Sequence, residues 1–149
     1  MIARALRNNN PGNLNAGSPW LGLLPRDQMN DAQRAETRFA VFKDAHYGFR
    51  ALVVTLLNYQ RVHKLDTIAA MIRRWAPPSE NDTGAYVRAV AKAAGVEPDA
   101  IIDLHDCALL CKIAKAIATH ECGGWLFQDG DLLSGVSAAL GVGGPPLVA

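Results

Sequence analysis

The 149-residue sequence predicts a mainly α-helical fold with an ordered N-terminal loop region and little sheet. Beyond residue 44, apolar side chains recur at intervals of three and four residues, the period of an amphipathic helix. Asp, Asn or Thr precedes these segments and Gly or Pro follows them, as helix starts and stops require. Half of the residues are hydrophobic, and the chain is long enough to bury one core. We therefore expect a single domain over residues 1–142 and a flexible tail over residues 143–149.

The first 40 residues favour ordered loop rather than helix. The stretch RNNNPGNLNAGSPWLGLLP is rich in Asn, Gly and Pro, which form turns because of their special backbone preferences. The apolar run FAVF at residues 39–42 fits either a short strand or a buried loop.

Five helices are expected after this region, each with its own start and stop signals. In order, they are residues 44–62, capped by Asp44; residues 67–75, capped by Asp66 and stopped by Pro77 and Pro78; a helix that starts at Asn81, Asp82 or Thr83 and closes at Gly95; a helix that starts at Asp103 or Asp106 and ends near Cys122; and residues 131–141.

Charge and composition exclude several functional classes. The chain has 15 Lys and Arg against 14 Asp and Glu, and this balance argues against non-specific nucleic-acid binding. No apolar run approaches the length of a membrane span, and the N-terminus lacks the apolar region of a signal peptide. We expect a protein made in the cytoplasm without a signal peptide, with no membrane insertion.

The fourth expected helix carries an apolar stripe that ends in a carboxylate. Leu110, Ile113, Ile117 and Glu121 lie three or four residues apart, so they share one helix face. The last turn of a helix and partial burial both disfavour a charged carboxylate. A carboxylic acid that stays protonated is what a glycosidase needs to protonate the leaving oxygen. The alternative is a structural Glu121 that reaches solvent or pairs with a lysine.

Other side chains could assist such a site. Glu80 is a candidate second carboxylate, although its segment also fits a purely helix-capping role. Tyr86 is either a core residue or a hydroxyl that lines a cleft. Trp20 lies in a Gly- and Pro-rich loop and is the best candidate to stack on a sugar ring, whereas Trp75 ends an apolar stripe and is expected to be structural.

The sequence does not predict a metal site. Cys107 and Cys111 have the i, i+4 spacing of a ligand pair, but His120 and Cys122 lie more than a helical turn away along the same expected helix. The residues considered are His105, Cys107, Cys111, His120 and Cys122. We expect no metal and no cofactor, and we interpret the cysteines as small buried residues of a reduced protein.

Several of these motifs together resemble a known family. They are RNNNPGNL, W-x-G at 20–22, FAVF before a helix with GFRAL, RWAPPSENDTGAYV and ATHECGG. In them the chain resembles phage and prophage virion-associated lytic structural proteins over nearly its whole length, to about residue 135. That family is similar to the lysin of enveloped double-stranded RNA phages and has a lysozyme-like, lytic-transglycosylase-like fold. Cys122 stands where the family usually has Asn, which argues against a direct role for it.

The resemblance implies a peptidoglycan-degrading enzyme, either an endolysin or a virion-associated lysin. It would cleave the bond between N-acetylmuramic acid and N-acetylglucosamine as a lytic transglycosylase or a muramidase, with Glu121 as the acid and Glu80 or Tyr86 assisting. The expected substrate-binding residues are Asn9, Asn10, Asn13, Trp20, Tyr47, Thr83 and Tyr86. The resemblance also implies a monomer that acts in the host periplasm or cell wall after holin release or virion delivery, where other virion proteins are further partners.

A second likeness concerns the order of the motifs. IAKAIATHECGG is similar to the helix that ends in the catalytic Glu of glucosaminidases and lytic transglycosylases, and NNNPGNLNAGSPWLG is similar to their substrate loop. The two occur here in reversed order, so we hypothesise a circularly permuted lysozyme-like domain. This requires the loop at residues 8–22 to lie near Glu121.

The alternative functions are a peptidoglycan endopeptidase, or a non-catalytic virion structural or wall-binding protein.

Overall fold

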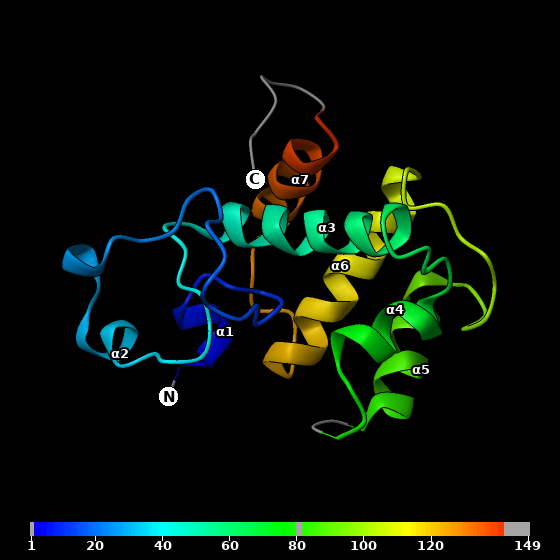
Figure 1. Cartoon of the computed structure of the whole chain (residues 1–149), viewed down its shortest axis with the longest axis horizontal. Helices are drawn as coiled ribbons and strands as arrows, with labels where there is room; N and C mark the ends of the chain where they lie inside the picture. The colour runs from blue at the N-terminus through cyan, green and yellow to red at the C-terminus, as the bar shows by residue number, and fades with distance from the viewer. Residues whose placement is uncertain (1, 80–81, 142–149) are drawn as a thin grey trace.

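The computed structural model describes residues 2–79 and 82–141, which form a mainly helical fold (Figure 1). This confirms the predicted fold class. Within these residues the elements are α1 (Arg4–Arg7), a 3-10 helix (Arg26–Gln28), α2 (Asp31–Arg34), α3 (Ala45–Arg61), α4 (Ile68–Trp75), α5 (Thr83–Ala94), α6 (Cys107–Cys122) and α7 (Asp129–Leu140). The tail predicted at residues 143–149 lies outside the described part of the chain.

Capping explains where α5 and α6 begin and end. Asp82 and Asp106 each accept a hydrogen bond from a backbone N–H of the first turn that follows. Gly95 and Gly123 end α5 and α6 in the left-handed conformation, at φ 72° and 74°. The prediction of Asp66 as a cap was wrong, because the hydroxyl of Thr67 accepts the bond from the Ala70 N–H.

The N-terminal region is more structured than a loop. It contains two four-residue helices and a 3-10 turn, and a capping box between Asn30 and Gln33 starts α2. The FAVF run is a buried loop with two isolated bridges, Asn15 with Phe39 and Leu23 with Phe42, rather than a strand. The sequence did not predict α1 and α2, because four residues are too few to show a periodic apolar pattern.

The core forms around α3, which crosses the middle of the molecule in Figure 1. Helix α7 packs against one side of α3, and α4, α5 and α6 lie on the other. Gly135 allows close contact between α7 and α3, since a Cβ there would lie 2.5 Å from the Cβ of Phe49. None of the described helices has the length and hydropathy that a membrane span requires.

Two glycines bring the N-terminal loop onto this helical core. A Cβ at Gly48 of α3 would lie 2.1 Å from the backbone oxygen of Asn9, and a Cβ at Gly12 would lie 2.6 Å from the Trp75 ring. The loop backbone therefore packs directly on α3 and on the end of α4. This contact fixes the loop beside the C-terminal end of α6.

Candidate active site

A cleft of about 390 Å³ opens where three separate parts of the chain meet. The N-terminal region, the ends of α3 and α4, and the end of α6 each contribute. Its lining residues are Gly12, Asn13, Leu14, Asn15, Arg38, Phe39, Tyr59, Arg74, Trp75, Ala76, Pro77 and Glu121. The volume is within the range of small-molecule and substrate sites.

Glu121 lies in this cleft at the end of a buried helix face. Leu110, Ile113 and Ile117 are at most 1% exposed, so the predicted apolar stripe faces the core and carries Glu121 to its edge. The Asn13 amide nitrogen donates to Oε1 over 2.9 Å, and the Tyr86 hydroxyl donates to Oε2 over 2.8 Å. Each carboxylate oxygen therefore has one neutral donor and keeps one lone pair for a proton.

Asn13 reaches Glu121 because its backbone is left-handed, at φ 49°. Asn adopts this conformation more readily than most residues. The contact joins the 8–22 loop to α6, the proximity that the circular-permutation hypothesis requires.

Tyr86 donates to Glu121 from the protein interior and not from the cleft. Its side chain is 1% exposed, and the His120 ring stacks on it at a centroid distance of 3.8 Å. Burial raises the pKa of the Tyr86 hydroxyl far above its usual range, and the negative charge of Glu121 adds to this. Tyr86 thus remains a protonated hydrogen-bond donor at neutral pH. It is absent from the cleft lining, in contrast to the predicted substrate contact.

The cleft also contains aromatic and basic residues that the sequence did not single out. The Tyr59 ring meets the Trp75 ring edge-on at 6.3 Å, and the Arg74 guanidinium lies 5.3 Å from the Tyr59 ring centroid. Trp75 was expected to be structural, yet its ring forms part of the cleft wall. No local motif marks Tyr59 or Arg74, because only the packing of α3 against α4 brings them together.

Two of the predicted sugar-binding asparagines have structural roles. The Asn9 amide nitrogen donates to the backbone oxygens of Phe42 and Lys43. Asn10 is fully buried, and its amide nitrogen donates to the backbone oxygens of Leu14 and Ala40. Neither residue lines the cleft, so of the three candidates only Asn13 belongs to the site.

The remaining predicted contacts also lie elsewhere. Trp20 and Tyr47 pack against a second small core cluster, formed by Ala40, Phe42 and Ala51, and neither lines the cleft. Thr83 is buried, and its hydroxyl donates to the Ala76 backbone oxygen over 2.7 Å. Glu80 lies outside the described residues. Within the described part of the chain, Glu121 is the one acidic side chain in the cleft lining.

The described His and Cys residues do not form a metal-binding group. Over residues 2–79 and 82–141, no group of three or more His, Cys, Asp or Glu side chains could hold a metal ion. All three cysteines are free thiols, and Cys107 is exposed, in contrast to the predicted buried position. Burial raises the pKa of the Cys122 thiol, which disfavours the nucleophilic thiolate.

Comparison with known proteins gives a match to a phage protein. No protein-family model matches this chain. The chain is similar to Protein P5 of Pseudoalteromonas phage PM2, with 38% identity over 98 residues. The aligned part covers 63% of this chain and 57% of that protein, so the match spans little more than half of the relative's length. This similarity to a phage protein supports the bacteriophage origin that the sequence motifs predicted.

Proposed function

We propose that the chain is a peptidoglycan glycosidase that cleaves the bond between N-acetylmuramic acid and N-acetylglucosamine. One observation carries the proposal: Glu121 ends a buried helix face inside a cleft, and its two oxygens accept hydrogen bonds from Asn13 and Tyr86. A carboxyl group held in this way is positioned before substrate arrives, which is what general acid catalysis requires. The similarity to a phage protein adds support, because a phage must cross the wall of its host.

In the proposed reaction, Glu121 acts first as acid and then as base. The Glu121 carboxylic acid gives its proton to the glycosidic oxygen, and the bond from that oxygen to C1 of the muramyl residue breaks. The resulting carboxylate removes the proton from the C6 hydroxyl of the same residue, and O6 bonds to C1. Glu121 is protonated again, no water is consumed, and the product is a 1,6-anhydro sugar.

The described part of the cleft is sufficient for this reaction. A hydrolase of the usual kind uses a second carboxylate as nucleophile or base, at about 5–9.5 Å from the acid. In the described lining, no acidic side chain accompanies Glu121. A single carboxylate is sufficient for the 1,6-anhydro product, and we propose lytic transglycosylase activity as the form to test first.

The peptidase alternative has no comparable support. A cysteine peptidase needs a thiolate beside a histidine. Here the ring of His120 stacks on Tyr86, and burial raises the pKa of the Cys122 thiol.

We propose the glycan strands as substrate, and a site of action in the host wall reached by holin release or virion delivery.

Replacing Glu121 by Gln tests the proposal. Glu121→Gln keeps the shape of the side chain but cannot transfer a proton, so lysis of purified cell walls, followed by turbidity, should fall by at least about a hundredfold. The matched control is Glu97→Gln, at an exposed position outside the cleft, which should lyse walls like the wild type. Retained lysis by Glu121→Gln would refute the assignment. Absence of lysis by the wild type, with retained wall binding, would instead support a wall-binding module.

A further inference from the structure

The cleft contains a basic residue that the proposed reaction does not use. Arg74 is the penultimate residue of α4 and lines the same cleft as Glu121. Resting on the proposed function, we infer that Arg74 and Tyr59 form a subsite for a carboxylate of the muramyl residue. This subsite would distinguish peptidoglycan from uncharged N-acetylglucosamine polymers.

The contacts of Arg74 hold its side chain in place without neutralising its charge. The guanidinium lies 5.3 Å from the Tyr59 ring centroid, and Nη2 lies 3.4 Å from Nε2 of His63. An aromatic face attracts the cation and restricts its motion. In the described part of the chain, no carboxylate forms an ion pair with Arg74. The guanidinium therefore keeps its positive charge available to a ligand.

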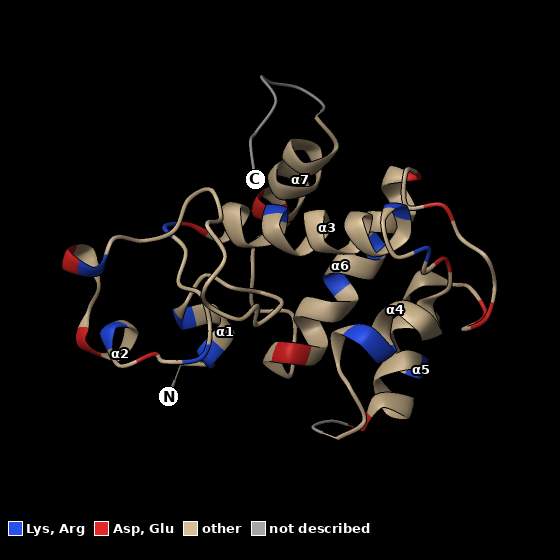
Figure 2. Cartoon of the chain, viewed as in Figure 1, with Lys and Arg blue, Asp and Glu red and all other residues tan. Residues whose placement is uncertain are grey.

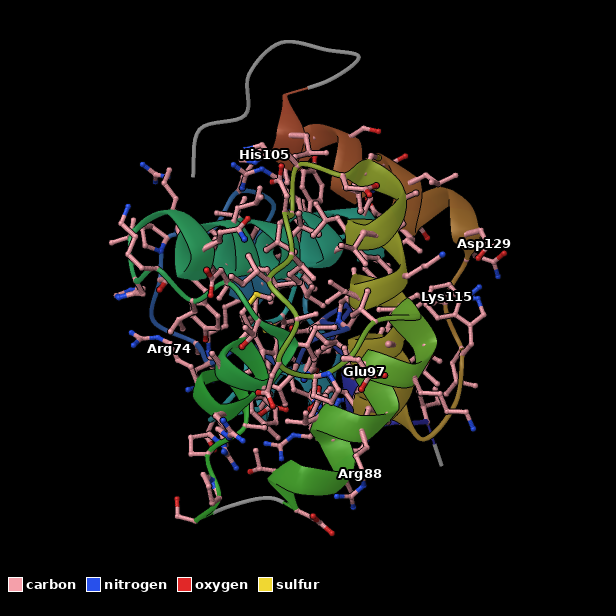
Figure 3. All side chains as sticks on the ribbon, turned by 90° about the vertical axis from the view of Figure 1, so that its right-hand side faces the viewer. Arg74, Arg88, Glu97, His105, Lys115 and Asp129 are labelled. Atoms are coloured by element: carbon pink, nitrogen blue, oxygen red, sulfur yellow. The ribbon has the colours of Figure 1, made fainter. Side chains whose placement is uncertain are left out.

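The cleft contains a basic and an acidic side chain from different helices. Its described lining includes the Arg74 guanidinium, from α4, and the Glu121 carboxylate, from α6. Figure 2 shows the basic end of α4 and the acidic end of α6 on the same lower side of the molecule. In Figure 3, Arg74 lies at the edge beside α4, on the other side of the view from the ion pair between Lys115 and Asp129.

A carboxylate is the group that such a residue recognises best. Guanidinium presents parallel N–H donors that match the two oxygens of a carboxylate. In peptidoglycan, only the muramyl residue carries carboxylates, either on its lactyl ether or on the attached stem peptide. N-acetylglucosamine carries none, so an arginine in the cleft can bind one of the two alternating sugars selectively.

Binding to three glycans tests the subsite, in the Glu121→Gln protein so that no ligand is cleaved. The ligands are intact glycan strands with stem peptides, strands from which an amidase has removed the peptides to leave free lactyl carboxylates, and N-acetylglucosamine oligomers. Adding Arg74→Gln should weaken binding to at least one muramyl ligand about tenfold or more, and binding to the oligomers less than about twofold. Arg74→Lys should lose part of the affinity, because it keeps the charge but not the paired donors.

Arg73→Gln is the matched control, because Arg73 lies in the same helix turn, is exposed and does not line the cleft. Its affinities should equal those of the parent protein. A loss with peptide-free strands assigns the lactyl carboxylate as the ligand, and a loss with intact strands alone assigns the stem peptide. Equal affinity for all three ligands after Arg74→Gln, an equal loss with the oligomers, or no binding by the parent protein would each overturn the subsite.

The same protein set separates this inference from the proposed function. If the Glu121→Gln protein binds muramyl strands through Arg74 but the wild type cleaves none, the subsite stands and the glycosidase proposal fails. If the wild type cleaves strands and Arg74→Gln changes neither binding nor cleavage, the glycosidase proposal stands and the subsite fails.

Discussion

At the residue scale, the account depends on how one carboxyl group is held. Asn13 and Tyr86 lie 108 and 35 residues from Glu121 in the sequence, and each donates to a different oxygen. Both donors are neutral, so they orient the carboxyl group without pairing it with a fixed positive charge. Positioning by neutral donors leaves Glu121 able to gain and lose a proton during one reaction cycle.

Tyr86→Phe should lower kcat about tenfold and leave KM unchanged, because it removes one donor to Glu121 but no group that lines the cleft. The ring and its stacking on His120 remain, so the thermal midpoint should change little. Steady-state rates on solubilised glycan strands measure the effect. Tyr47→Phe, at a half-buried tyrosine outside the cleft, is the control and should match the wild type. An unchanged kcat for Tyr86→Phe would remove Tyr86 from the positioning of Glu121.

Glu121 was predictable from the sequence, whereas its partners were only partly so. A stripe of apolar residues that ends in a carboxylate is visible as a periodic pattern. Asn9, Asn10 and Asn13 share one short motif, and local sequence does not say which amide faces the backbone and which faces the cleft. That distinction arises from tertiary packing, in which Asn9 and Asn10 bind backbone oxygens of the 40–43 segment.

At the scale of elements, a buried carboxylate fastens α1 to the segment that follows α2. The Glu36 side chain is fully buried and accepts hydrogen bonds from Arg4, Arg7 and Asn8. It also accepts bonds from the backbone N–H groups of Arg38 and Phe39, which continue into the cleft wall. The hydrogen bonds from Arg4 hold the pKa of Glu36 well below its ordinary value. Glu36 thereby joins α1 to the segment after α2, near the site.

The Glu36 network makes stability depend on acid pH. Because the folded-state pKa is depressed, the stabilisation is complete above the unfolded-state pKa near 4.5 and is lost as the pH falls below it. At pH 7, Glu36→Gln should reduce the free energy of unfolding by about 1–2 kcal/mol, since its arginine partners are partly exposed.

Urea denaturation at pH 7, 4 and 3 measures this dependence. The difference between the wild type and Glu36→Gln should shrink toward pH 3, while Glu97→Gln, at an exposed glutamate, should follow the wild type throughout. A difference that stays constant or widens with acid would contradict the assigned pKa shift.

Glycine at position 48 decides whether the N-terminal loop can lie on α3. Gly48→Ala should destabilise the protein by roughly 3 kcal/mol, because its Cβ would meet the backbone oxygen of Asn9 rather than a movable side chain. Thermal unfolding measures the change. The same substitution at Gly130 of α7, where the added Cβ meets nothing within 4 Å, should stabilise the protein by about 0.5–1 kcal/mol through helix propensity. Equal effects at the two positions would show that loop contact does not limit position 48.

At the scale of the whole molecule, the site forms only when three distant segments meet. The helices after residue 44 were predictable because their periodic apolar faces, and the caps of α5 and α6, are local. The cleft was not, since Trp75, Arg74 and Tyr59 become neighbours only through the packing of α3, α4 and the N-terminal loop. The predicted stacking role of Trp20 differs from its observed position for the same reason, because its loop packs on the second small cluster instead.

The arrangement of the chain also bears on the permutation hypothesis. An N-terminal loop lies against the end of a C-terminal catalytic helix, and the Asn13–Glu121 hydrogen bond joins the two. This proximity supports a lysozyme-like site assembled from motifs in reversed order, which stays a proposal about the fold.

The central claim is that Glu121 cleaves the glycan strand, and mass spectrometry of the products from purified peptidoglycan tests it most directly. The wild type should release fragments that end in 1,6-anhydro-N-acetylmuramic acid with intact stem peptides, and the Glu121→Gln protein should release none. Cleaved stem peptides with intact glycan strands, or the same anhydro products from the Glu121→Gln protein, would contradict the account.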